Sequence, residues 1–364
     1  MNICIVAGAR PNFIKVAPIM RAIDNAKAQG KDVACQLVYA GADSDETLEQ
    51  SLFDDLQMRR PDVFLGVDCA SLNELTGRVM GEFEHYLETH PTDVVIVVDD
   101  LASTMAAAIV TKKQGIRLAH LVAGTRSFDI RMPKEINRLV IDGLSDLLFT
   151  AGEGACQIVS REGAQLSQVY MVGNILMDTL RANYTRLRRP EVLGQLGLED
   201  KSYLVFTLNR KALIANRDNL RQMLKAMLEA AGGTHIVAPL RGEARKTVAS
   251  LLATINMPLD TFHLTDPMGY LEFGYLTAHA KGIITDSGNV AEEATFNGVP
   301  CATLNSYTEH IETVRTGSNV LVGEDAQCLR ETVEDMVAGR WKKSNIPDRW
   351  DGRSAERIVQ ILLS

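Results

Sequence analysis

Several loops of this 364-residue chain place charged side chains directly after an apolar run, where they could bind an anion or move a proton. The first apolar run ends in Gly8-Ala9-Arg10-Pro11-Asn12, and Lys15 lies in the first turn of the helix expected next. The glycine spacing matches neither a dinucleotide-binding fingerprint nor a Walker A loop. Two cations beside a helix N-terminus would suit a phosphate or a carboxylate. The alternative is that Arg10 and Lys15 are solvated surface charges.

Two carboxylates, Asp99 and Asp100, follow the apolar run 94–98. A carboxylate at the end of a buried strand can act as a general base or accept a hydrogen bond from a substrate hydroxyl. Asp is also a common helix N-cap, so a purely structural role remains open for this pair. The next strand end, residues 120–126, places Arg126 near the same region.

A third candidate loop, residues 285–293, closes one strand and opens a helix. Backbone N–H groups at Gly288, the Ser287 hydroxyl and the helix dipole together would make a site for a diphosphate. Glu293, about two turns into that helix, could accept hydrogen bonds from a ribose diol. The alternative is a plain Asp or Ser cap followed by a solvent-facing acidic turn.

The elements that must position these loops alternate between strand and helix along the whole chain. An uninterrupted β-branched run such as residues 94–98 is typical of a strand covered on both faces, as in a parallel sheet. A polar stretch at 185–202 separates two such series, which predicts two doubly wound α/β domains facing a cleft. The expected strands are 3–6, 33–39, 94–98, 118–122, 147–149, 169–172, 204–207, 236–238 and 283–285, and the expected helices are 13–28, 72–88, 103–114, 155–162, 219–231, 243–252 and 292–296.

Composition excludes several classes of function. With 46 acidic and 38 basic residues the net charge is −8, and no run of five Lys or Arg occurs, which argues against nucleic acid or an anionic membrane as a partner. No stretch of eighteen apolar residues could span a bilayer, and the first residues do not form a signal peptide, so we expect a cytoplasmic protein. The six Cys lack metal-binding or disulfide spacing and are expected to be small buried apolar residues.

The order of the motifs carries a resemblance. The chain presents the Gly8 to Lys15 loop, Asp100 with Ser103-Thr104, and the Ala123-Gly124-Thr125-Arg126 turn. These are followed by Pro133-Lys134-Glu135-Ile136-Asn137-Arg138, Val172-Gly173-Asn174, the 285–293 segment, Thr308-Glu309-His310-Ile311-Glu312 with Gly317, and a closing 351–358 segment. This ordered set resembles the non-hydrolysing UDP-N-acetylglucosamine 2-epimerases nearly from end to end.

The resemblance implies a GT-B-like pair of Rossmann-like domains. The first would comprise residues 1–173, completed by 353–364, and bind the sugar; the second would comprise residues 174–352 and bind UDP. The C-terminal helix, apolar at several positions of residues 354–363, would pack back on the first domain.

The resemblance also implies an isomerase that inverts C2 of a UDP-N-acetylhexosamine by eliminating UDP and adding it back, in the supply of sugars for surface polysaccharide. It implies no cofactor, a UDP-sugar as the only small-molecule partner, and a homodimer. The residues it assigns to catalysis are Asp100, Glu135 and Asn209. Those it assigns to substrate binding are Arg10, Lys15, Arg126, Arg138, Arg210, Arg241, Ser287, Gly288, Glu293 and His310.

The chain departs from the family pattern at positions that matter for proton transfer. Val122 and Lys134 stand where the family has Glu, and Asn209 stands where it has a His. Asn cannot cycle a proton near neutral pH, so these changes predict reduced activity by the family mechanism. His310 stands where the family has Arg.

Two alternatives therefore stay open. One is a catalytically impaired or repurposed UDP-sugar-binding homologue, and the other is a hydrolase or glycosyltransferase acting on a related UDP-sugar. The added cations Lys134, Lys211 and Arg241 would favour a more acidic sugar such as a uronic acid.

Overall fold

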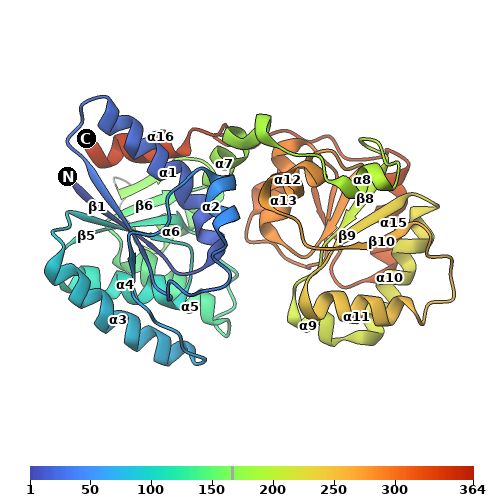
Figure 1. Cartoon of the computed structure of the whole chain (residues 1–364), viewed down its shortest axis with the longest axis horizontal. Coiled ribbons are helices and arrows are strands. Elements are labelled where there is room, and N and C mark those ends of the chain that lie inside the picture. The colour runs from blue at the N-terminus through green and yellow to red at the C-terminus, as the bar shows by residue number, and fades with distance from the viewer. Residues whose placement is uncertain (165–167) are drawn as a thin grey trace. The chain divides into compact units, whose positions relative to one another are not determined.

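The computed structural model describes residues 1–164 and 168–364 of the chain (Figure 1). The chain divides into two compact units, one formed by residues 1–182 with 348–364 and the other by residues 183–347. Each unit has its own parallel sheet covered by helices, as the alternation of apolar runs and amphipathic segments predicts.

The sheet of the first unit has seven strands in the order β3-β2-β1-β4-β5-β6-β7. The central strand β4 is buried along its whole length, which explains why its sequence is an unbroken apolar run. The strands are β1 (Asn2–Ala7), β2 (Ala34–Tyr39), β3 (Val63–Phe64), β4 (Val94–Val98), β5 (Arg117–Ala123), β6 (Leu147–Thr150) and β7 (Val169–Met171).

The helices of the first unit cover both faces of this sheet. Buried side chains of α3, α4 and α5, such as Phe83, Ala107 and Ile141, form one core with Val6, Val95 and Val97 of the strands. Helices α1 and α16 pack against each other. The helices are α1 (Arg10–Ala28), α2 (Gln50–Leu56), α3 (Leu72–Thr89), α4 (Ala102–Lys113), α5 (Pro133–Leu144), α6 (Glu153–Arg161), α7 (Ile175–Asn183) and α16 (Ser354–Leu363).

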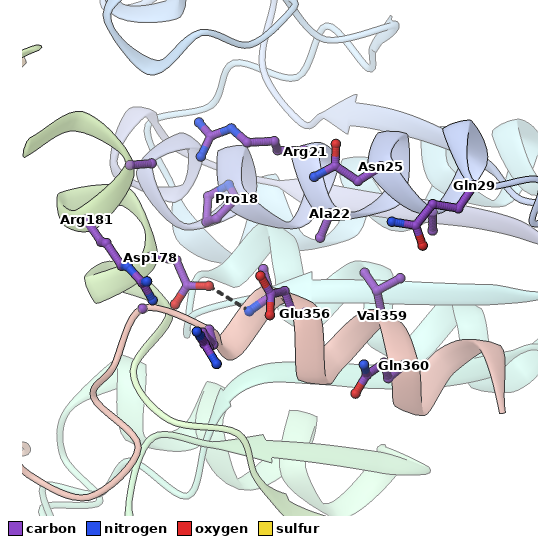
Figure 2. Close-up of a pocket in the computed structure, with 15 residues that line it drawn as sticks. Pro18, Arg21, Ala22, Asn25, Gln29, Asp178, Arg181, Glu356, Val359 and Gln360 are labelled. Carbon is purple, nitrogen blue, oxygen red and sulfur yellow. Dashed lines mark hydrogen bonds between the residues drawn. The ribbon is translucent and has the colours of Figure 1, made fainter. Parts of the chain in front are cut away.

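The C-terminal helix α16 packs on the first unit, which confirms the prediction from its apolar residues. A cavity of about 600 Å³ lies among α1, α7 and α16. Figure 2 shows residues that line it, among them Arg21, Asp178 and Glu356. Asp178 of α7 accepts hydrogen bonds from the backbone N–H groups of Ser354 (3.0 Å) and Ala355 (2.8 Å) at the start of α16.

The observed units differ from the predicted domain boundaries at 173 and 353. Helix α7 and residues 348–352 belong to the first unit because their contacts lie there. Thr179 donates a hydrogen bond to the Ile14 carbonyl (2.5 Å), and the Trp350 indole N–H donates to the Ala151 carbonyl (3.1 Å). A sequence pattern alone does not carry these long-range contacts.

The second unit contains a six-stranded parallel sheet in the order β10-β9-β8-β11-β12-β13. Its strands are β8 (Tyr203–Phe206), β9 (His235–Pro239), β10 (Phe262–Thr265), β11 (Gly282–Thr285), β12 (Cys301–Thr303) and β13 (Asn319–Leu321). Its helices are α8 (Glu191–Gln195), α9 (Lys211–Ala215), α10 (Arg217–Ala231), α11 (Gly242–Leu252), α12 (Tyr270–Ala278), α13 (Gly288–Asn297), α14 (Ile311–Arg315) and α15 (Ala326–Val337).

The sequence patterns located many of the long elements but missed helices α5 and α15, of twelve residues each, and several short elements. Strand β4 and helix α16 begin and end at the predicted residues, and α1 starts three residues before its predicted start. Strands β12 and β13, of three residues each, were not predicted because so few positions show no periodicity. Within the described residues, the chain contains no helix with the length and apolar character needed to cross a bilayer.

Candidate functional site

Each sheet reverses its strand order at one point, and several of the predicted site residues lie on the loops there. In the first unit the reversal lies between β1 and β4, and in the second it lies between β8 and β11. Ligands of doubly wound sheets bind outside the carboxyl ends of the strands at such a point. The loops after β1 and β4 and those after β8 and β11 are therefore the candidate site of their own unit.

In the first unit, the loop after β1 is tied to the loop after β4 by Asp99. The Asp99 carboxylate contacts Lys15 Nζ (2.5 Å) and accepts a hydrogen bond from Asn12 Nδ2 (2.7 Å). Asn12 Oδ1 in turn accepts from the backbone N–H groups of Gly8 (2.9 Å) and Ala9 (3.1 Å). Lys15 is thus buried and held by a carboxylate, whereas Arg10, the first residue of α1, is half-buried.

Asp100 lies in a cluster of charges with residues of α5. Its carboxylate contacts Arg138 (2.6 Å) and Lys134 (3.4 Å), and its backbone carbonyl accepts from Asn137 Nδ2 (2.8 Å). Burial alone would raise the pKa of Asp100, but the charges of Lys134 and Arg138 outweigh it and hold the pKa below its ordinary value. Asp100 is therefore an ionised carboxylate paired with two cations.

Glu135 is buried beside this cluster and accepts several hydrogen bonds. They come from the backbone N–H and hydroxyl of Ser127 (both 2.9 Å), the backbone N–H of Phe128 (2.9 Å) and the Arg138 guanidinium (3.0 Å). Burial would raise its pKa, but these hydrogen bonds outweigh it and lower the pKa. Glu135 therefore fixes the loop before α5 and orients Arg138.

A buried charge network lies at the end of β5. His120 Nδ1 contacts Asp142 Oδ1 (2.5 Å), and its Nε2 lies 3.0 Å from the Asp99 carbonyl oxygen, so both ring nitrogens face oxygen atoms. The Arg126 guanidinium contacts Asp142 (2.7 Å) and Glu162 (2.5 Å) and is itself buried. This placement favours a structural role for Arg126, which the sequence reasoning placed near the substrate.

Val122, between these two residues, adopts an unusual backbone. Its φ is +73°, in the left-handed region that β-branched residues rarely enter, and the register of β5 against β6 shifts at this point. Asp142 Oδ2 accepts from the Gly124 N–H (3.1 Å) and Thr125 Oγ1 donates to the Val122 carbonyl (3.2 Å). Tertiary hydrogen bonds thus hold the strained turn that carries Val122.

In the second unit, Asp286 joins the loops after β8 and β11. Its carboxylate accepts from the backbone N–H groups of Asn209 (2.7 Å) and Arg210 (2.5 Å). The Asn209 side chain is exposed, and the Arg210 guanidinium contacts Asn305 and Glu324. Arg241, at the start of α11, and Lys211, the first residue of α9, are exposed near the ends of the neighbouring strands β9 and β8.

Helix α13 follows β11 at the carboxyl edge of the second sheet, and its first backbone N–H groups donate no hydrogen bond within the described residues. Ser287 is its N-cap, and its hydroxyl accepts from the Val290 N–H (3.5 Å). Within the described residues, the backbone N–H groups of Gly288 and Asn289 donate no hydrogen bond. The start of α13 therefore offers free N–H groups and a positive dipole end to an anion.

Glu293, further along α13, is buried without a hydrogen-bond partner among the described residues. Burial, reinforced by the neighbouring charge of Glu292, raises the pKa of Glu293 to about 8. The Tyr270 hydroxyl of α12 is also buried and has no hydrogen-bond partner in the described part of the chain. Burial, and then the charge of Glu293, raise the pKa of Tyr270. Buried polar groups are normally paired, so the unpaired Tyr270 hydroxyl beside Glu293 points to a polar ligand.

Sequence reasoning located most of these positions but missed several partners. Asp142, Asp286 and Tyr270 were not singled out, because each acts through residues distant in the sequence. A carboxylate directly after a strand, as at Asp286, is the signal that could have identified one of them. Among the described residues, no group of three or more His, Cys, Asp or Glu could hold a metal ion.

Comparisons with known proteins agree with this geometry. A family model described as UDP-N-acetylglucosamine 2-epimerase matches residues 25–363. The chain belongs to the UDP-N-acetylglucosamine 2-epimerase family. This confirms the resemblance read from the ordered motifs.

Individual members of the UDP-N-acetylglucosamine 2-epimerase family match the whole chain. A homologue of the enzyme from Methanococcus maripaludis is 34% identical, with 100% of this chain and 99% of the relative covered. The crystal structure of the Methanocaldococcus jannaschii enzyme in complex with UDP-GlcNAc and UDP has a TM-score of 0.84 at 32% identity, with 100% and 99% covered. A UDP-2,3-diacetamido-2,3-dideoxy-D-glucuronate 2-epimerase from Pseudomonas aeruginosa is 29% identical, with 100% and 99% covered.

These matches confirm the predicted fold class of two parallel-sheet α/β domains of the GT-B-like type. They also support an isomerase rather than a member of another enzyme class. The family membership does not depend on the departures at Val122, Lys134 and Asn209, since the family model and the relatives span all three positions.

Proposed function

We propose that this protein is a UDP-N-acetylglucosamine 2-epimerase that interconverts UDP-N-acetylhexosamines at C2. The observation that carries the proposal is the start of α13, where free backbone N–H groups, the Ser287 cap and the unpaired buried Glu293 lie at the switch point of the second sheet. Such a site suits a diphosphate at the helix N-terminus and a ribose diol at the carboxyl group. Membership of the family agrees with that ligand.

In the proposed reaction, a base removes the C2 proton and the electron pair forms a C1–C2 double bond. The C1–O bond breaks as this double bond forms, and its electron pair leaves with UDP. UDP then adds back to C1 of the unsaturated sugar while a proton is delivered to the other face of C2. Of the residues assigned to catalysis, we propose Asp100 as the base, because it is a carboxylate at the end of β4 whose partners are side chains, whereas Glu135 accepts backbone N–H groups. Glu135 and Asn209 are proposed to position Arg138 and the substrate, respectively.

The remaining binding residues are assigned by position within each unit. Arg10, Lys15 and Arg138 surround the β1 and β4 ends of the first sheet, and Arg210, Arg241, Gly288 and His310 surround the β8, β9 and β11 ends of the second. Cations at these positions would stabilise the diphosphate as it leaves. We expect the substitutions at Val122, Lys134 and Asn209 to change the rate of the reaction and not its type.

Proton NMR of UDP-GlcNAc in heavy water tests the proposal. An epimerase exchanges H2 for deuterium and forms the C2 epimer with UDP retained at equilibrium. Net release of UDP would instead indicate a hydrolase, and UDP-GlcNAc binding without exchange would indicate a non-catalytic homologue. Asp100→Asn is expected to lower kcat/KM at least about 100-fold, the scale of one general base. The matched control Asp129→Asn, in the loop before α5, should leave it unchanged.

A second candidate substrate is a UDP-sugar that carries a carboxylate. The side chains of Lys134, Lys211 and Arg241 are exposed, and a relative that is 29% identical acts on a diacetamido glucuronate. Calorimetry with UDP-GlcNAc and with its C6 uronate measures the preference. Equal affinity for the two would reject the acidic-sugar alternative.

A further inference from the structure

Phe128, in the loop between β5 and α5, carries an aromatic ring that the fold leaves in water. Its side chain is 76% exposed, the highest fraction among the large apolar residues that the structure describes. Single exposed apolar residues are common on protein surfaces, so exposure alone assigns no role to this ring. What distinguishes Phe128 is the backbone that holds it.

The backbone of Phe128 is strained and yet fixed. Its φ is +60°, in the left-handed region that is unfavourable for residues with a Cβ atom. Its N–H donates to Glu135 Oε1 (2.9 Å), and the backbone N–H and hydroxyl of Ser127 donate to Glu135 Oε2 (2.9 Å each). Glu135 is itself 3% exposed. A buried carboxylate thus holds an unfavourable conformation that leaves the ring outside the core.

Strained residues gather at this end of the first sheet. Six non-glycine residues of the described chain have a positive φ, and three of them are Asp99, Val122 and Phe128. Asp99 directly follows β4, Val122 lies near the end of β5, and Phe128 is in the loop after β5. Such outliers persist only where their surroundings over-determine them, and they concentrate at functional sites. This placement points to a role of Phe128 in the site and not in folding.

A chain of contacts links the Phe128 turn to the proposed base. Glu135 contacts the Arg138 guanidinium (3.0 Å), which in turn contacts the Asp100 carboxylate (2.6 Å). Lys134, next to Glu135 in the sequence, also lies 3.4 Å from Asp100. The ring of Phe128 is therefore anchored beside a cluster of charged side chains.

The proposed reaction needs an apolar contact at this cluster. When the C1–O bond breaks, the unsaturated sugar loses its covalent link to UDP, so affinity for the diphosphate no longer retains it. Charged side chains bind the hydroxyl groups of a hexose, but its C–H groups form an apolar face. Ligand sites cover such faces with apolar and aromatic side chains, and Phe128 is an aromatic ring next to Asp100.

Resting on the function proposed above, we propose that Phe128 packs on the C–H face of the hexose and retains the unsaturated sugar until UDP adds back to C1. The ring positions the sugar, takes up no proton and forms no covalent bond. Without the ring, UDP and the unsaturated sugar leave before re-addition. This escape consumes no water and yields UDP and unsaturated sugar in equal amounts.

Proton NMR of a UDP-GlcNAc reaction measures free unsaturated sugar and C2 epimer in the same sample. We expect Phe128→Ala, which removes the ring, to raise the ratio of unsaturated sugar to epimer about tenfold. In an Asp100→Asn background, chosen to suppress turnover, Phe128→Ala should raise the Kd of UDP-GlcNAc about tenfold, which corresponds to ~1.4 kcal/mol. The Kd of UDP, which lacks the hexose, should not change.

Two substitutions provide the matched controls. Phe128→Tyr keeps an aromatic ring, so the product ratio and both Kd values should stay at those of the parent. Ile130→Ala removes another apolar side chain of the same loop, 61% exposed, and should also leave them unchanged. Unchanged circular dichroism shows that each variant is folded.

Three results would overturn the role of Phe128. If Phe128→Ala leaves the product ratio and the Kd of UDP-GlcNAc unchanged, the ring does not contact the sugar. If affinity for UDP falls as much as affinity for UDP-GlcNAc, the ring does not act on the hexose. If only the oligomeric state changes on size-exclusion chromatography, the ring contacts a second copy of the chain.

Failure of the proposed function gives a different pattern. If the unaltered chain binds UDP-GlcNAc but forms neither epimer nor unsaturated sugar, the proposed function fails. The Kd values then decide the role of Phe128, because a loss of affinity confined to UDP-GlcNAc supports the contact and no loss overturns it. If UDP-GlcNAc binds none of the chains, both proposals are overturned.

Discussion

Asp178 lines the cavity between α1, α7 and α16, at the N-terminus of α16 (Figure 2). Burial and hydrogen bonding shift its pKa in opposite directions, so substituting it tests which of the two is larger. Its carboxylate accepts the N–H groups of Ser354 and Ala355, which favours the ionised form. Burial opposes this and dominates, so that the pKa of Asp178 rises from 3.8 to about 6. The native state therefore holds a proton on Asp178 at pH values where the unfolded chain has lost it.

The sign and size of the effect follow by linkage. The stabilising contribution of this proton is complete only well below the ordinary pKa of 3.8 and is lost as pH rises through 6. At about 1.4 kcal/mol per pKa unit, the shift corresponds to ~3 kcal/mol. Asp178→Asn removes the titration and keeps one acceptor oxygen. Part of this contribution is already lost at pH 4, so the free energy of unfolding of the variant, minus that of the parent, should increase by about 2.4 kcal/mol between pH 4 and 7.5.

Urea unfolding followed by tryptophan fluorescence measures this difference in the first unit alone. The chain has two Trp, and replacing Trp341 of the second unit by Phe leaves Trp350 of the first unit as the only reporter. Trp350 is buried, with 1% of its surface exposed, so its emission changes on unfolding. Asp24→Asn, which removes an exposed carboxylate of α1, is the matched control and should show no such pH trend.

Two results would refute the reasoning. Parallel stability profiles for Asp178→Asn and the parent would show that the carboxyl group has no raised pKa. A difference that decreases as pH rises would show that the α16 N–H groups stabilise the carboxylate more than burial penalises it.

Three further substitutions are measured with the same unfolding assay, using Trp350 for the first unit and Trp341 for the second. Asp142→Asn removes the carboxylate from a buried ion pair with Arg126 and should lower the free energy of unfolding by about 3 kcal/mol. A loss below about 1 kcal/mol would show that the contacts of Asp142 with His120 and Arg126 are not needed for stability. Tyr270→Phe removes a buried hydroxyl without a partner among the described residues, so stability should stay equal or rise by up to ~1 kcal/mol, and a clear loss would reveal a partner. Gly173→Ala should lower the free energy of unfolding by at least about 2 kcal/mol, because the new methyl group would lie 2.0 Å from a carbonyl oxygen. Gly163, with a similar φ of +101°, has open space around it, so Gly163→Ala should cost less. Equal costs for the two substitutions would reject the steric argument.

The sequence by itself determined the class of fold and the loops that carry the polar groups. Unbroken apolar runs such as residues 94–98 specify buried parallel strands, and the residues that follow such strands must emerge at the carboxyl edge of a sheet. The ordered motifs also indicated the family, which the whole-chain matches confirmed. These features are local in the sequence, which is why pattern and spacing could show them.

The tertiary structure decided which side chains meet. Arg126 and Lys15 are both buried beside carboxylates, but Arg126 contacts Asp142 and Glu162 beyond the end of β5, whereas Lys15 contacts Asp99 at the switch point between β1 and β4. The sequence also carries no sign that Glu292 orients the His310 ring towards Gly288. Burial and ion pairing depend on groups that are distant in the sequence, and a charged side chain is buried only where folding supplies its partner.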